Sequence, residues 1–129
     1  MRRICFITLM LAIICGSFSL AVAASNIDVQ AAQRLLKERR DVYLLDVRTP
    51  GEYQQMRLAD AHLIPIDQVT RRIDEIPKNR PVIIYCAVGS RSAQVFNFLA
   101  RKGYQEVYNL DGGIYAWAQR GLPILQGQP

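Results

Sequence analysis

Apolar and polar residues alternate along the chain in blocks that predict strands and helices in turn. Short, largely apolar runs are typical of strands buried on both faces, and they cover residues 41–47, 63–65, 81–86 and 106–110. Between these runs, apolar residues return at helical spacing, which predicts helices that begin near residues 28, 50, 67, 92 and 113. Because strands alternate with helices, we expect one α/β domain with a parallel sheet covered on both faces.

Residues that commonly begin or end helices mark three of these predicted helices. Asp28 can cap the first helix. Asp67 can cap a helix that Pro77 ends, because proline cannot continue a helix. The helix over residues 92–102 has Gly103 as its stop.

The first residues of the chain have the composition of a secretory signal. Arg2 and Arg3 precede an uncharged apolar run over residues 4–20, and small residues follow up to Ala23 and Ala24. This order of charged, apolar and small residues is that of a signal peptide. Cleavage after Ala23 or after Ala24 fits the small residues best.

The expected organisation is a signal peptide over residues 1–23 and a single domain over residues 24–129. A periplasmic or otherwise exported location follows from it, with no stable membrane association after the signal is removed. A retained membrane anchor is the alternative, because a run of this length could almost span a bilayer. A lipid anchor on Cys15 is disfavoured, because Ile14 stands where lipoprotein signals have a small residue.

The distribution of charge argues against a nucleic-acid partner. The chain of 129 residues carries a formal net charge of +5. Its basic residues are interspersed with acidic ones, as in residues 37–41 and 71–75, and they form no basic stripe. We expect a mildly basic, solvated surface, no nucleic-acid binding and a monomer, which is the default for so small a domain.

Cysteine usage points to one special thiol. Cys5 and Cys15 belong to the predicted signal, so Cys86 is alone in the expected domain. A domain that used disulfides for stability would carry an even number of cysteines. Cys86 is therefore either an inert buried residue or a reactive thiol. It ends the strand predicted over residues 81–86, and ligands of parallel sheets collect at the carboxyl ends of strands.

The segment after Cys86 has the residues that an anionic sulfur needs. Backbone N–H groups of a tight loop can curl toward the sulfur, and the helix that begins near Ser92 adds the positive end of its dipole. Arg91 supplies a permanent charge with a fork suited to oxyanions. These three features would lower the pKa of the Cys86 thiol. Gly89 gives the loop freedom to close, and Ser90 and Ser92 offer hydroxyl donors.

Three segments of the chain resemble the signatures of single-domain rhodaneses. They lie at residues 86–92, within residues 46–53 together with 64–65, and within residues 110–123. Together they cover nearly all of the expected domain, and they follow one another in the order that rhodaneses have.

This resemblance implies a rhodanese-like three-layer α/β/α fold with a five-stranded, mostly parallel sheet. It also implies a thiosulfate sulfurtransferase, an enzyme whose Cys86 accepts sulfane sulfur as a persulfide and passes it on. We expect no cofactor, and no metal, because no cluster of Cys, His or carboxylates has metal-ligand spacing. Thiosulfate or another sulfane donor would be the substrate, and cyanide or a thiol the acceptor. The residues expected to bind the substrate are Ala87, Val88, Gly89, Ser90, Arg91 and Ser92.

Two other functions remain open at this point. Related phosphatases have a longer loop than the four residues between Cys86 and Arg91, which disfavours a phosphatase or an arsenate reductase. A non-catalytic rhodanese-like binding module commonly lacks the loop cysteine, which this chain keeps. The sequence does not indicate the natural donor or the natural acceptor.

The chain departs from the rhodanese pattern just before its Ile-Pro pair. Met56 and Arg57 stand where relatives often have Gly-His, Asp60 replaces a common glycine, and His62 replaces a common Ile or Val. We expect Arg57 to face solvent in a loop. We also expect His62, the only histidine, to be exposed and not paired with the reactive thiol.

Other conspicuous residues are expected to have structural roles. The resemblance suggests that Asp46 and Arg48 fix the loop after their strand by a salt bridge or by backbone hydrogen bonds. A carboxylate beside the thiolate would raise the pKa of the thiol, which argues against catalysis by Asp46. Trp117 and Tyr115 are expected to pack in the core or in a lid.

Overall fold

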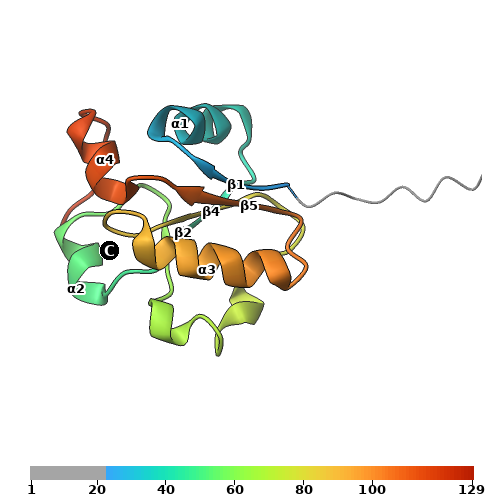
Figure 1. Ribbon diagram of the computed structural model, residues 1–129. Helices are drawn as coiled ribbons and strands as arrows, with labels where there is room; N and C mark the ends of the chain where they lie inside the picture. The colour runs from blue at the N-terminus through green and yellow to red at the C-terminus, as the bar shows by residue number, and fades with distance from the viewer. Residues whose placement is uncertain (1–22) are drawn as a thin grey trace, which may run out of the picture.

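A sheet of five parallel strands forms the centre of the part of the chain that the structure describes (Figure 1). The structure is a computed structural model, and it describes residues 23–129. The strands are β1 (Ala23–Ile27), β2 (Tyr43–Asp46), β3 (His62–Leu63), β4 (Val82–Tyr85) and β5 (Glu106–Leu110). They lie in the order β1-β5-β4-β2-β3, and every pairing is parallel. The five-stranded sheet implied by the resemblance is confirmed.

Helices cover both faces of this sheet, which confirms the expected three-layer α/β/α arrangement. They are α1 (Val29–Glu38), α2 (Pro50–Gln55), α3 (Ser90–Arg101) and α4 (Gly113–Gln119), with short 3₁₀ helices η1 (Ile66–Gln68) and η2 (Ile73–Glu75). Figure 1 shows α1 and α4 on one side of the sheet and α3 on the other. Within residues 23–129, no helix is both long enough and apolar enough to cross a membrane.

Strand β4 shows how the sequence forms two cores and directs the thiol. Successive side chains of a strand point to opposite faces of the sheet. Val82 and Ile84 belong to the core under α3, whereas Ile83 and Tyr85 belong to the core under α1 and α4. Cys86 continues this alternation and joins the core on the α3 side. The alternation therefore turns its thiol toward the helix that follows it.

The prediction of a helix capped by Asp67 is wrong. This stretch forms two short 3₁₀ helices joined by turns. Asp67 lies inside η1, and no side chain caps the first turn of η1 or η2. Arg72, at φ −110° and ψ 19°, lies outside the helical range. The hydroxyl of Tyr104 lies 3.1 Å from the carbonyl oxygens of Ile73 and Ile76, so a tertiary contact holds the end of η2. The Asp28 cap is confirmed, because its carboxylate accepts the N–H of Ala31 at 2.7 Å.

Strand β1 is an element that the apolar pattern does not predict. It contains the polar residues Ser25 and Asn26, and it lies at the edge of the sheet, where it pairs with β5. An edge strand does not need the continuous apolar run that marks a strand buried on both faces. The predicted cleavage positions, after Ala23 and after Ala24, fall on the first residues of β1. The rest of the predicted signal lies outside the described residues, so the signal and the exported location stay predictions.

The expectation that Arg57 faces solvent is wrong. The residue is only 7% exposed. Its guanidinium donates to the carbonyl oxygen of Gly127 at 2.7 Å and lies over the ring of Tyr53 at 5.1 Å. Its backbone exchanges two hydrogen bonds with Leu125, at 2.9 and 2.8 Å. The C-terminal segment therefore covers Arg57, and the guanidinium satisfies a carbonyl that would otherwise need water.

Asp60 has a backbone conformation that favours glycine. Its φ of 61° lies in the left-handed region, which costs most residues free energy but which aspartate tolerates better than most. This conformation explains why glycine is common at this position in rhodaneses. The departure at Asp60 therefore preserves the turn.

The conformation of Asp60 predicts how two substitutions rank. Asp60→Gly should be more stable than Asp60→Ala by about 0.5–1 kcal/mol, because only glycine adopts a positive φ freely. Both variants lose the same carboxylate, so comparing their free energies of unfolding in urea isolates the backbone effect. An Asp60→Ala protein as stable as the Asp60→Gly protein would contradict the left-handed turn.

Candidate active site

Cys86 lies at the carboxyl end of β4, where the chain leaves the sheet and turns into α3 (Figure 1). It is the only cysteine in residues 23–129, its thiol is free, and it is fully buried at 0% exposure. Helix α3 begins at Ser90, ahead of the start predicted at Ser92. The loop between strand and helix is therefore short, and it keeps the first turn of α3 next to the sulfur.

The sulfur of Cys86 accepts hydrogen bonds from this loop and from α3. The N–H of Gly89 lies 3.1 Å from Sγ, the N–H of Ser92 lies 3.4 Å from it, and the hydroxyl of Ser92 lies 3.3 Å from it. Gly89 turns the chain back over the sulfur at φ 101°, a conformation that favours glycine. Ser92 is itself fully buried, so water does not compete with its hydroxyl for the sulfur.

The balance of burial and hydrogen bonding lowers the pKa of the Cys86 thiol. Burial is the largest single effect, and it raises the pKa because it removes water from the thiolate. The hydroxyl and N–H of Ser92 and the N–H groups of Gly89 and Val88 lower the pKa, and together they outweigh burial. The thiolate, which is the nucleophilic form, is therefore more populated here than in a free cysteine.

Arg91 lies at the start of α3, but its fork is bound by a carboxylate. Its two terminal nitrogens donate to the two carboxylate oxygens of Glu52 at 3.0 and 2.9 Å, and both side chains are about one-third exposed, at 31% and 34%. The hydrogen bond from Arg91 lowers the pKa of Glu52. In return, Glu52 raises the pKa of Arg91, and the charge of Cys86 adds to this effect.

Glu52 is a site residue that sequence analysis did not single out. It is the third residue of α2, and its N–H lies 3.2 Å from the hydroxyl oxygen of Thr49, which caps the helix. This spacing is that of a capping box, in which the glutamate would reach back to the cap. Its carboxylate binds Arg91 instead, 39 positions away in the sequence. An acidic residue in the signature that precedes the loop was the available signal, but only the fold brings it to the arginine.

The other loop residues predicted to bind substrate take different positions. Val88, at the tip of the loop, is 58% exposed. Ser90 is also exposed and Ala87 is half-buried. Of the two serines in this segment, the structure therefore brings Ser92 to the sulfur, whereas Ser90 faces outward.

A buried ion pair holds α2 in place. The carboxylate of Asp46 lies 2.6 Å from Arg48, and it also accepts the backbone N–H of Arg48 at 2.9 Å. Arg48 then donates to the carbonyl oxygens of Met56 at 2.7 Å and Glu52 at 3.4 Å. The expected salt bridge between Asp46 and Arg48 is confirmed. It fixes the backbone of the helix whose side chain binds Arg91.

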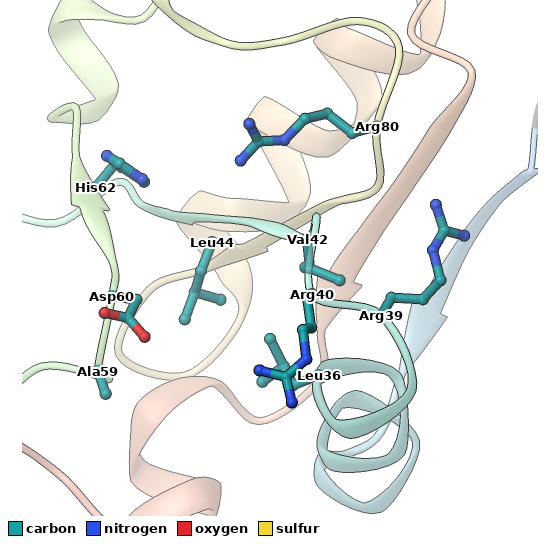
Figure 2. A pocket seen from close by; sticks show the side chains of 9 residues that line it. All are labelled: Leu36, Arg39, Arg40, Val42, Leu44, Ala59, Asp60, His62 and Arg80. Atoms are coloured by element: carbon teal, nitrogen blue, oxygen red, sulfur yellow. The ribbon is translucent and has the colours of Figure 1, made fainter.

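A hollow of about 420 Å³ lies away from the cysteine loop (Figure 2). It is lined by Leu36, Arg39, Arg40, Val42, Leu44, Ala59, Asp60, His62 and Arg80. These residues come from the end of α1 and from the amino-terminal sides of β2, β3 and β4, whereas Cys86 follows the carboxyl end of β4. His62 is exposed and stacks on Tyr43 with ring centroids 4.3 Å apart. It therefore forms no dyad with Cys86.

Comparison with known proteins agrees with this geometry. Residues 28–120 match the Rhodanese-like domain. A sulfurtransferase of Allochromatium vinosum is 45% identical over 101 residues, which are 78% of this chain and 94% of that protein. The thiosulfate sulfurtransferase GlpE of Vibrio cholerae is 31% identical over 99 residues, 77% of this chain and 92% of that protein. A rhodanese-like domain protein from Staphylococcus aureus has a similar structure, with a TM-score of 0.69 and 34% identity over 79% of this chain and 98% of that chain.

The domain match runs from the cap of α1 to the end of α4 and includes the whole cysteine loop. Both sequence relatives also align over more than two-thirds of the chain. The chain therefore belongs to the rhodanese-like domain family.

Proposed function

We propose that this protein is a sulfurtransferase that carries sulfur as a persulfide on Cys86. Relatives named as sulfurtransferases support sulfurtransferase activity in general. The observation that carries the proposal for Cys86 is the set of N–H and O–H groups directed at its buried sulfur. Such a site stabilises a sulfur anion without a metal or a cofactor.

The proposed reaction has two displacement steps at sulfur. The Cys86 thiolate attacks the sulfane sulfur of thiosulfate, the S–S bond of thiosulfate breaks, and sulfite leaves with the electron pair. The product is a persulfide on Cys86. A nucleophilic acceptor, cyanide or a thiolate, then attacks the outer sulfur, and the Cys86 thiolate leaves. Because the leaving groups are stable anions, neither step needs a general acid.

Arg91 is proposed to bind the oxyanion part of the donor together with the loop amides. A guanidinium has five N–H donors, and Glu52 occupies only one on each terminal nitrogen. The remaining donors are free to bind an oxyanion at the partly exposed mouth of the site. Glu52 would keep the guanidinium in place between turnovers.

Several features favour sulfur transfer over the alternatives. The loop is shorter than that of related phosphatases and closes directly onto the sulfur, with the nearest N–H at 3.1 Å from Sγ. A binding module would need no thiol with a lowered pKa, and Cys86 has one. Cys86 is the only cysteine in residues 23–129, so we propose that the acceptor comes from outside this domain.

Thiosulfate should load one sulfur atom onto the protein. The intact mass should rise by one sulfur after incubation with thiosulfate, and cyanide should remove this sulfur as thiocyanate. Cys86→Ala should show neither change, because the only proposed nucleophile is gone. Ser25→Ala, at an exposed position of β1, serves as the control and should load sulfur like the unaltered protein. A folded, reduced protein that gains no sulfur and forms no thiocyanate would contradict the proposed reaction with thiosulfate.

The hydroxyl of Ser92 should shift the pH dependence of the thiol. Alkylation of Cys86 by iodoacetamide follows the thiolate, so its rate rises as the pH passes the pKa of the thiol. Ser92→Ala removes a donor to the thiolate and should move this rise to higher pH, with a rate about tenfold lower at neutral pH. Ser90→Ala, which removes an outward-facing hydroxyl, should leave the profile unchanged. Identical profiles for both variants would show that the Ser92 hydroxyl does not stabilise the thiolate.

A further inference from the structure

The back of the cysteine loop rests on the chain that runs from β5 into α4. The N–H of Ile114 donates to the carbonyl oxygen of Cys86 at 2.9 Å, and the N–H of Tyr115 donates to that of Ala87 at 3.1 Å. The side-chain amide of Asn109 donates to the carbonyl oxygen of Gly89 at 3.4 Å. Residues 109–115 therefore bind three carbonyl oxygens of the loop, and the carbonyl of Gly89 also accepts the N–H of Ala93 in α3 at 3.1 Å.

The direction of these carbonyls decides where the N–H groups of the loop point. In a planar trans peptide, the C=O of one residue and the N–H of the next point in opposite directions. With the carbonyl of Ala87 bound by Tyr115, the N–H of Val88 is turned toward the sulfur. The N–H of Val88 is one of the groups that lower the pKa of Cys86. A peptide turned the other way would present an oxygen to the sulfur anion and repel it.

Gly113 allows this close approach. It is buried, and its φ is 60°. A Cβ at this position would lie 2.5 Å from the carbonyl oxygen of Cys86 and would overlap the carbonyl oxygen of Ala87. These are backbone atoms of the loop, so a larger residue would push the loop itself.

We propose that residues 109–115 form a clamp that holds the Cys86 loop in its anion-binding conformation, with Gly113 as the main positioning residue. The clamp is defined by Asn109, Gly113, Ile114 and Tyr115. The contacts that define it are with the loop, so it acts on the thiol through the loop. The role of the clamp in sulfur transfer rests on the proposed function. Its effect on the reactivity of the Cys86 thiol does not depend on which substrate the thiol attacks.

The clamp reaches the edge of the sheet. Asn109 lies in β5 and is buried, and its side-chain amide also donates to the side chain of Asn26 in β1 at 2.9 Å. One amide group thus joins the edge strand to the carbonyl of Gly89. A substitution of the Asn109 side chain can therefore test the clamp without changing a glycine of the backbone.

Gly113→Ala and Gly121→Ala form a matched pair that tests the clamp. Gly121 has a similar φ of 70°, but a Cβ there meets nothing within 4 Å. Both substitutions place alanine in a left-handed conformation and should lower the thermal midpoint. Only Gly113→Ala should also slow alkylation of Cys86 at neutral pH, by about tenfold, and move its pH profile upward. Thiosulfate loading should slow by at least the same factor in Gly113→Ala and stay unchanged in Gly121→Ala.

Asn109→Ala provides a second test if the Gly113→Ala protein does not fold. It removes one neutral hydrogen bond to the loop and should slow alkylation at neutral pH by about threefold. A folded Gly113→Ala protein whose alkylation profile matches that of Gly121→Ala would overturn the clamp, as would an unaltered profile for Asn109→Ala. Alkylation does not require sulfur transfer. A shifted alkylation profile in a protein that never loads thiosulfate would therefore support the clamp and contradict the proposed thiosulfate reaction.

Discussion

The structure depends on how an anionic sulfur is stabilised where water cannot reach it. Cys86 is fully buried, and burial alone would favour the neutral thiol. The N–H groups of Gly89 and Ser92 and the hydroxyl of Ser92 replace the lost water, and they reverse the direction in which the pKa moves. This works only while the donors stay within hydrogen-bond distance, so much of the surrounding structure acts to fix the loop.

Two supports fix the loop from different sides. In front, the buried pair of Asp46 and Arg48 holds the backbone of α2, and α2 presents Glu52 to Arg91. Behind, the chain that enters α4 binds the loop carbonyls. The first support sets the charge at the mouth of the site, and the second sets the direction of the loop amides. Both supports belong to segments that resemble rhodanese signatures. Contact with the cysteine loop explains why these signatures lie far from Cys86 in the sequence.

Much of this arrangement could be predicted from the sequence, and the failures have physical causes. The apolar run that ends at Cys86 predicted β4 and the position of the thiol, because a strand buried on both faces needs continuous apolar residues. The edge strand β1 has no such need and left no pattern. The burial of Arg57 depends on the C-terminal segment that folds over it, and the pairing of Glu52 with Arg91 depends on tertiary contact. The local pattern of apolar and polar residues cannot predict either of these long-range contacts.

A crystal structure of the protein after exposure to thiosulfate would test the central claim most directly. The account predicts additional density for one sulfur atom on Sγ of Cys86, with the outer sulfur within hydrogen-bond distance of the loop N–H groups and the loop in its present conformation. An unmodified Cys86 in protein that has loaded sulfur elsewhere would contradict the account. A persulfide whose outer sulfur points away from the loop amides would contradict it as well.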